Sequence, residues 1–244
     1  MENSLLIALS RQTALRRDMT TVANNIANMN TQAFKRESIM FDDFLMRSKG
    51  GERIMGDKLS FVHDVAQYRD LSEGNFEETG NPLDLAIHGE GYFTVETPQG
   101  NRYTRNGHFQ LNSDGIVVNT DGYPVLTDGG DKIQTNATDT RIEISRTGQI
   151  YTDAGQIGKI GVVEFANPQN LEKVSNTLLS AKNETAQPVE TPDVLQGKLE
   201  SSNVEPIIEM TRMIDIQRSY ENAKKLVEKE DERIRKASTL ITNG

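Results

Sequence analysis

The sequence predicts an α+β protein: long N- and C-terminal helices that form a coiled-coil-like domain, with a central, mainly antiparallel β domain. Two observations support this prediction. Both ends carry apolar residues at alternating steps of three and four, whereas the middle carries short β-type runs separated by Asp-Gly and Asn-Gly pairs. At 244 residues, the chain is long enough to bury a core in one large domain or two smaller ones.

The N-terminal helix is predicted from a heptad seam with one polar interruption, Gln12. The seam positions are Met1, Leu5, Ala8, Gln12, Leu15, Met19, Val22, Ile26 and Met29. Asn3 or Ser4 suits the N-cap of this helix because their side chains accept backbone N–H bonds.

The C-terminal helix shows the same alternation, again with one polar member, Glu230. Its seam positions are Met213, Ile216, Tyr220, Ala223, Val227, Glu230, Ile234, Ala237 and Ile241. Pro206 suits the first turn, and Asn203 or Ser202 suits the cap. Amphipathic helices covering a globular core are the commoner use of such stripes, but narrow seams on long helices favour two helices that pack on each other.

The middle of the chain is predicted to form an antiparallel sheet, as a small barrel or sandwich. Its β-type runs are Leu83–Ile87, Tyr92–Glu96, Ile116–Val118, Arg141–Ser145 and Lys159–Phe165. The turn signals between them are Asn106-Gly107, Asp114-Gly115, Asp121-Gly122, Asp128-Gly129-Gly130 and Thr147-Gly148. Primed hairpin turns need positive φ, which glycine supplies at no steric cost.

These patterns predict three regions. Residues 1–30 with 204–244 form a terminal helical domain, residues 31–78 with 185–203 an extended connecting region, and residues 79–184 a β-rich outer domain. The glycine-bearing stretch 49–56 is expected to be flexible. Residues 31–203 hold 26 acidic and 16 basic residues, whereas both ends are near neutral. Segments that pack against many copies of themselves should avoid a single-sign field, and a solvated outer domain tolerates one.

The composition excludes several classes of protein. The chain has no cysteine, so it has no disulfide framework and no thiolate chemistry. The start MENSLLIALSRQ lacks the basic region of a secretory signal, and no apolar stretch is long enough to span a bilayer. The formal charge of −9 argues against nucleic acid as a partner.

No catalytic, cofactor or metal site is predicted. The Asp-Gly pairs lack the alternating oxygen ligands and closing glutamate of an EF-hand loop. His63, His88 and His108 show no metal spacing and have no serine elbow or paired acid to accompany them. The stretch His88–Tyr92 is rich in glycine but precedes a predicted strand, so it does not aim helical N–H groups at a phosphate. We therefore expect no enzyme activity and no cofactor.

Three motifs resemble the axial proteins of the bacterial flagellum, the rod and hook subunits. The first is NNIANMNTQAFK at 24–35, the second is TGNPLDLAIHGEGYF at 79–93 with YTRNGHF at 103–109 and DGYPVL at 121–126, and the third is GKLESSNVEP at 197–206 followed by Glu209-Met210 and Gln217–Glu221. The motif residues that we single out are Asn24, Asn25, Asn28, Thr31, Phe34, Lys35, Ser202, Asn203, Val204, Gln217, Arg218 and Tyr220. One departure is Ala33, where the family commonly has glycine.

The resemblance implies a non-enzymatic structural subunit of the flagellar basal-body rod. Such subunits stack helically, their terminal helices line a central channel, and they transmit motor torque by packing alone. The implied partners are copies of the chain and other rod subunits, without nucleic acid or a small-molecule substrate. The implied location is the periplasmic rod, reached through the flagellar type III export system. The compact middle favours a short rod subunit over a distal rod or hook subunit, and an oligomeric surface binding module is the alternative class.

The seam residues are expected to mediate assembly. They are Leu5, Leu15, Met19, Val22, Ile26, Met213, Ile216, Tyr220, Val227 and Ile234. The amides of Asn24 and Asn25 are expected to bond between subunits, whereas Asn28 and Asn30 suit a helix end. In the free monomer, residues 1–30 and 205–244 are expected to be poorly ordered, because each helix alone exposes an apolar seam.

Overall fold

The structure is a computed structural model that describes the backbone of residues 2–47, 58–135 and 141–242. It describes the side chains of residues 7–40, 67–135, 141–233 and 235–236. The chain divides into two compact units, which are described separately below. The helical unit consists of Met1–Ala27, Glu37–Asp70 and Glu205–Gly244, and the β unit consists of Asn28–Arg36 and Leu71–Val204.

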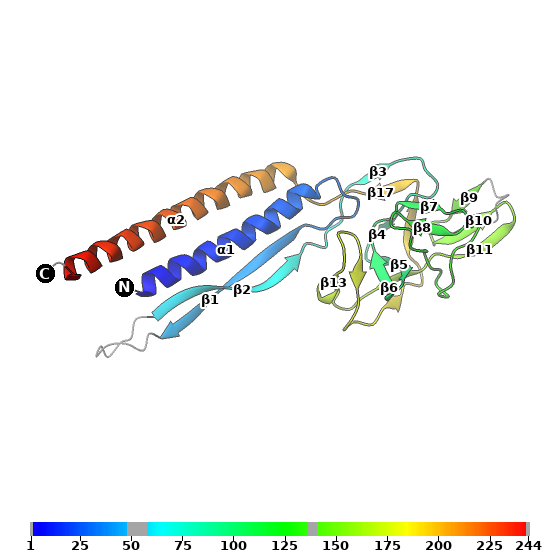
Figure 1. Cartoon of the computed structure of the whole chain (residues 1–244). Helices are drawn as coiled ribbons and strands as arrows, with labels where there is room; N and C mark the ends of the chain where they lie inside the picture. Colours follow the sequence, from blue (N-terminus) through cyan, green and yellow to red (C-terminus); the bar gives the residue numbers. More distant parts are fainter. Residues whose placement is uncertain (1, 48–57, 136–140, 243–244) are drawn as a thin grey trace. The chain divides into compact units, whose positions relative to one another are not determined.

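The helical unit contains the two predicted terminal helices. Helix α1 spans Glu2–Ala27 and helix α2 spans Pro206–Thr242, so the proline occupies the first turn as predicted. Strands β1 (Glu37–Arg47) and β2 (Lys58–Arg69) form a long antiparallel hairpin with a bulge after Met40. Helix α1 lies between α2 and this hairpin (Figure 1).

The sequence analysis did not predict the hairpin. Its strands do not alternate apolar and polar residues, since β1 reads ESIMFDDFLMR, and period-2 alternation is the signal by which a half-buried strand is recognised. The predicted flexible stretch 49–56 lies outside the described residues.

The β unit is mainly antiparallel, as predicted. Its largest sheet has the strand order β13-β14-β6-β5-β12-β15, and smaller sheets pair β11-β10-β9, β16-β4, β17-β3 and β7-β8. The strands are β3 (Phe76–Glu78), β4 (Leu85–His88), β5 (Tyr92–Thr97), β6 (Gly100–Thr104), β7 (Phe109–Leu111), β8 (Val117–Asn119), β9 (Ile142–Ile144), β10 (Gln149–Thr152), β11 (Gly155–Lys159), β12 (Val162–Glu164), β13 (Glu172–Lys173), β14 (Leu179–Ser180), β15 (Gln187–Pro188), β16 (Asp193–Gln196) and β17 (Lys198–Glu200). A short 3₁₀ helix, η1, spans Pro168–Asn170.

One apolar core holds the small sheets of the β unit together. Phe93 and Phe109 meet edge to face at its centre, with ring centroids 5.2 Å apart. Gly115 and Gly122 have φ of 73° and 84°, as the Asp-Gly turns require. Gly107 has a different role: a Cβ there would lie 1.8 Å from the carbonyl oxygen of Leu85, so this glycine permits a close backbone approach instead of a primed turn.

Candidate functional site

Helices α1 and α2 pack antiparallel, and two polar contacts fix their alignment. Near the end of α1, Asn25 Nδ2 donates to Glu209 Oε2 at 3.1 Å, in the first turn of α2. Further from that end, Arg212 Nη2 donates to Asp18 Oδ1 at 3.0 Å. As α1 is followed backwards from Asn25 to Asp18, α2 advances from Glu209 to Arg212, which defines the antiparallel direction.

The predicted seam residues differ in burial. Val22 and Ile216 are fully buried within the helical unit, at 0% and 6% exposure. The half-buried seam residues are Leu15, Met19, Ile26, Met213, Tyr220 and Val227. The side chains of Leu5 and Ile234 lie outside the described residues. The buried members of the seam are therefore covered within the helical unit of one chain.

Asn25 joins three elements of the helical unit. Its side chain is fully buried, accepts the backbone N–H of Glu37 at 3.0 Å and donates to the backbone oxygen of Glu37 at 2.8 Å. Together with the bond to Glu209, these contacts tie α1 to β1 and to α2. The prediction that the Asn25 amide bonds between subunits is therefore wrong, because its polar atoms are used within the chain. That interpretation stays a prediction for Asn24.

Three buried carboxylates surround this contact. Glu209 is fully buried, and its place in the first turn of α2 stabilises negative charge through the helix dipole. Glu37 and Asp18 are buried as well. Burial raises the pKa of Asp18; the adjacent Arg212 opposes this rise, and Glu209 adds to it.

Helix α2 also carries apolar side chains that face away from the seam. Ile207 is 81% exposed, Met210 46% and Ile214 50%, and their i, i+3, i+7 spacing places them on one helix face. We call Ile207, Met210 and Ile214 the outer apolar face. Sequence reasoning missed it, although the spacing was visible, because only the seam positions were counted. Ile208 and Leu226 are also exposed, and a groove of about 460 Å³ beside Ile208 runs between α1 and α2.

In the β unit, the N-terminal motif is held by a buried cluster of charges. Lys35 Nζ contacts Glu200 Oε1 at 2.5 Å and donates to the Ser72 backbone oxygen at 2.7 Å. Arg105 Nε donates to Glu200 Oε2 at 2.9 Å, and the backbone N–H of Gly74 donates to Glu200 Oε1. Burial lowers the pKa of Lys35, while Glu200 acts to raise it and Arg105 adds to the lowering.

In the C-terminal motif, Asn203 connects its own segment to those of Arg36 and Ser72. Asn203 Oδ1 accepts the backbone N–H of Arg36 at 2.7 Å, and Asn203 Nδ2 donates to the backbone oxygen of Ser72 at 3.0 Å. The hydroxyl of Ser202 accepts the N–H of Val204, which is buried. Neither Ser202 nor Asn203 caps α2, which begins at Pro206, so that prediction is wrong: Asn203 joins distant chain segments, and Ser202 bonds locally to Val204.

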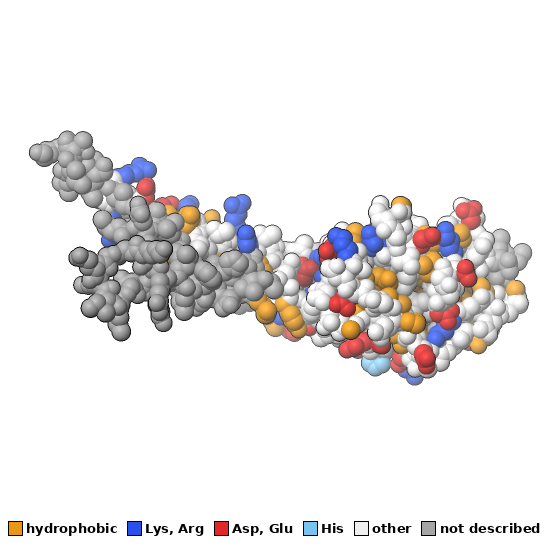
Figure 2. Space-filling model, turned by 90° about the horizontal axis from the view of Figure 1, so that it is seen from below, with side chains coloured by type: hydrophobic (Ala, Val, Ile, Leu, Met, Phe, Trp, Pro, Cys, Tyr) orange, Lys and Arg blue, Asp and Glu red, His pale blue; other side chains and the backbone are white. Residues whose placement is uncertain are grey.

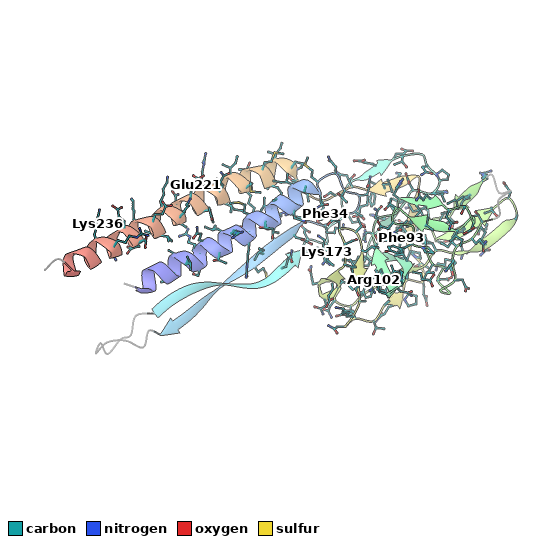
Figure 3. The ribbon with its side chains drawn as sticks, viewed as in Figure 1. Phe34, Phe93, Arg102, Lys173, Glu221 and Lys236 are labelled. Atoms are coloured by element: carbon teal, nitrogen blue, oxygen red, sulfur yellow. The ribbon has the colours of Figure 1, made fainter. Side chains whose placement is uncertain are left out.

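Three further motif residues, Asn28, Thr31 and Phe34, belong to the segment Asn28–Arg36. Asn28 Oδ1 accepts from the Thr31 hydroxyl and from Asn176 Nδ2, at 3.2 and 2.9 Å. Phe34 is buried, and Lys173 Nζ lies 4.9 Å from its ring centroid (Figure 3). In α2, Gln217 and Arg218 are exposed, and Gln217 is within 3.5 Å of Glu221 Oε1.

Ala33 adopts a left-handed conformation, with φ of 55°. This is the position at which the resemblance implies glycine. A non-glycine residue in this region costs about 1–2 kcal/mol. The strain is maintained by the surroundings, because Ala33 is buried and its N–H donates to the Glu200 backbone oxygen at 2.8 Å.

The histidines are engaged in ordinary contacts. His108 Nδ1 lies 2.7 Å from buried Asp84, and His88 Nδ1 lies 3.2 Å from Glu73. The side chain of His63 lies outside the described residues. Across the described part of the chain, no three His, Asp or Glu side chains are grouped as metal ligands would be. In the same residues, neither terminal helix carries an apolar stretch that would cross a bilayer.

Comparison with known families accounts for most of the chain. The family model "Flagella basal body rod protein" matches residues 5–35, "Flagellar hook protein FlgE/F/G D1 domain" matches residues 86–152, and "Flagellar basal body rod FlgEFG protein C-terminal" matches residues 195–240. The first and third stretches contain the N- and C-terminal motifs on which the resemblance was based, and the second contains the central motif from residue 86 onward.

Individual relatives match over nearly their full length. The flagellar basal-body rod protein FlgF of Caulobacter vibrioides is 39% identical over 239 residues, which cover 97% of each chain. FlgF of Mesorhizobium japonicum is 36% identical over 93% of this chain and 92% of its own. The rod protein FlgG of Agrobacterium fabrum is 34% identical over 94% of this chain and 95% of its own. The chain belongs to the family of flagellar basal-body rod proteins.

Proposed function

We propose that this chain is a structural, non-enzymatic subunit of the flagellar basal-body rod. It polymerises through its terminal helices with copies of itself and with other rod subunits, in a coiled-coil-like arrangement around an export channel. Residues 1–30 and 204–244 form the assembly core, and residues 79–184 form the outer domain. The subunit reaches the periplasmic rod through flagellar type III export. The match to FlgF relatives over 97% and 93% of this chain supports a rod subunit that has a compact middle domain, as FlgF has.

The outer apolar face is the observation that carries this proposal. Ile207, Met210 and Ile214 are 46–81% exposed, whereas the seam residue Ile216 is buried, so burial within the described helical unit does not account for apolar side chains on this face. Burying one such side chain stabilises a contact by about 1.5–3 kcal/mol. A helix of a soluble monomer normally presents polar residues there, and an exposed apolar stripe marks an interaction surface.

The distribution of charge supports terminal helices that assemble and a middle region that stays solvated. Residues 204–244 carry eight acidic and eight basic residues, so copies of this segment approach one another without net repulsion. The acidic excess lies in the middle of the chain. Figure 2 shows acidic, basic and apolar side chains interspersed over the visible face of the β unit. This mixed surface is typical of a domain that is largely solvated.

The proposal is tested by placing charge on the outer apolar face. In cells lacking the wild-type protein, the variant Ile207→Asp/Ile214→Asp should be absent from purified basal bodies and abolish swimming. Its β unit should melt as in the wild type, since neither residue belongs to that unit. Val174→Asp is the control, because Val174 is 55% exposed but lies in the β unit. Normal incorporation of the double variant, or absence of the wild-type chain from basal bodies, would contradict the proposal.

A further inference from the structure

A cavity of about 220 Å³ opens on the β unit beside the buried charge cluster. Its apolar lining comes from Leu71, Tyr92, Phe165 and Pro168. The rings of Tyr92 and Phe165 are 5.8 Å apart, and Tyr103 meets Phe165 edge to face at 4.8 Å, so the aromatic lining is itself packed in place. The volume is below the 300–1,000 Å³ or so of typical drug-sized ligand pockets, and it suits one long side chain.

The basic residues in the cavity wall are already neutralised. Arg105 donates hydrogen bonds to Glu200 and to the backbone oxygens of Ile87, Gly89 and Gly91, and its Nη2 lies 3.6 Å from Glu73. Lys35, the other basic residue of the wall, pairs with Glu200. An anion entering the cavity would therefore have to compete with the fully buried carboxylate of Glu200 and with Glu73.

The acidic residues Glu90 and Glu164 at the cavity, in contrast, are not neutralised by partners within the described residues. Glu90 and Glu164 line it and are exposed, and neither side chain has an ion pair or side-chain hydrogen bond within the described residues. Counted with the neutralised cluster, they leave the cavity with two uncompensated negative charges next to an aromatic surface. A cation with an apolar stem complements this combination, since the stem packs on the rings while the charge lies near the carboxylates.

We propose that this cavity is a socket for an arginine or lysine side chain presented by a neighbouring subunit. The inference rests on the proposed function, because a rod subunit has neighbouring subunits that can present such a side chain to part of its otherwise solvated β unit. A side chain delivered by a protein is favoured over a free metal ion: the two carboxylates are exposed, and the described residues group no third ligand with them. In the assembled rod, the socket makes the lateral contact selective for a partner with a basic residue at that point.

The first test uses the full chain and a small probe. N-acetyl-arginine amide at millimolar concentration should shift the backbone NMR signals of Gly91, Tyr92 and Phe165, whereas N-acetyl-citrulline amide, which has the same shape without the charge, should not. The variant Glu90→Gln/Glu164→Gln should weaken binding of the arginine probe about five- to tenfold. Equal shifts with both probes, or no shift with either, would overturn the proposal. Tighter binding of spermidine than of the arginine probe would also overturn it, in favour of a free polyamine.

The second test is made in cells. Glu90→Lys/Glu164→Lys should lower the amount of the subunit in purified basal bodies several-fold. Asp114→Lys/Asp128→Lys changes net charge equally at exposed sites that do not line the cavity and should leave incorporation unchanged. Equal incorporation of both double variants would refute the socket while leaving the rod assignment intact. Absence of the wild-type chain from basal bodies would instead refute the rod assignment, so the two failures are distinguishable.

Discussion

Replacement of Glu200 by glutamine tests whether the buried charge cluster holds the β unit together. The side chain of Glu200 has no exposed surface, and those of Lys35 and Arg105 are each only 8% exposed. Glu200 thus contacts two cations that water hardly reaches, and Arg105 has Glu73 at 3.6 Å as a second, more exposed partner. Glutamine keeps the shape and one acceptor oxygen, but its NH₂ group would face a donor, either Lys35 Nζ or Arg105 Nε.

The expected loss of stability is large because both cations stay buried after the change. Removing one partner of a buried ion pair costs about 3–5 kcal/mol, most of it from the charge left uncompensated. For a unit of this size, that corresponds to a fall in melting temperature on the order of 10 °C. Near-UV circular dichroism of the full chain can follow the transition, since four of the six tyrosines lie in the β unit and the chain has no tryptophan.

Two controls define what would refute this reasoning. Glu143→Gln removes a carboxylate whose side chain is 61% exposed and pairs with Arg141, and it should cost no more than about 0.5 kcal/mol. Lys35→Met combined with Glu200→Gln should be less destabilised than the sum of the single changes, because the uncompensated lysine is gone. A loss below about 1 kcal/mol for Glu200→Gln, or strict additivity of the pair, would show that water stabilises these charges in the fold.

Three further predictions follow from the described contacts. Ala33→Val should lower the free energy of unfolding, measured in urea, by about 1–3 kcal/mol, because a β-branched residue fits poorly at φ of 55°. Ala33→Gly should stay within about 1 kcal/mol of the wild type. Equal stability of all three proteins would contradict backbone strain at this position. Burial lowers the pKa of Lys35 in the folded state, so between that pKa and about 10.5 the unfolded chain binds more protons than the folded chain. The free energy of unfolding of the wild type should therefore rise relative to that of Lys35→Met as the pH is raised through this window. A rise on lowering the pH would contradict the prediction. In limited proteolysis of dilute monomer, α1 and α2 should be cleaved before the β unit, because the outer apolar face stays uncovered until subunits assemble; equal resistance of helices and β unit would count against assembly-dependent ordering.

The elements of this fold were predictable wherever a local pattern specifies them. Alternating three- and four-residue steps identified both helices, and Pro206 marked the start of α2. Asp-Gly pairs marked turns at Gly115 and Gly122, where positive φ leaves little alternative to glycine. The hairpin of β1 and β2 was missed because its strands do not alternate apolar and polar residues. Where a strand packs against a helix, the choice of apolar and polar residues depends on its tertiary neighbours.

The contacts of the motif residues were not predictable, because they join positions far apart in the chain. Asn25 bonds to Glu209 across 184 positions, and Lys35 pairs with Glu200 across 165. Nothing in the local sequence indicates that an amide near the end of a helix will be used within the chain instead of between subunits. Only the packed structure shows that both polar atoms of the Asn25 side chain are occupied.

The two apolar faces of α2 have different physical consequences. The seam joins α1 to α2 through side chains such as Val22 and Ile216, so a charge there would destabilise the helical unit before assembly begins. The outer apolar face is already exposed, so a charge there removes little from the folded chain and acts on contact with other molecules. A chain that needed its helices only for its own folding would gain solubility from polar residues at Ile207 and Ile214. Isoleucine at both positions is what we expect of a surface that becomes buried in a larger assembly, as proposed above.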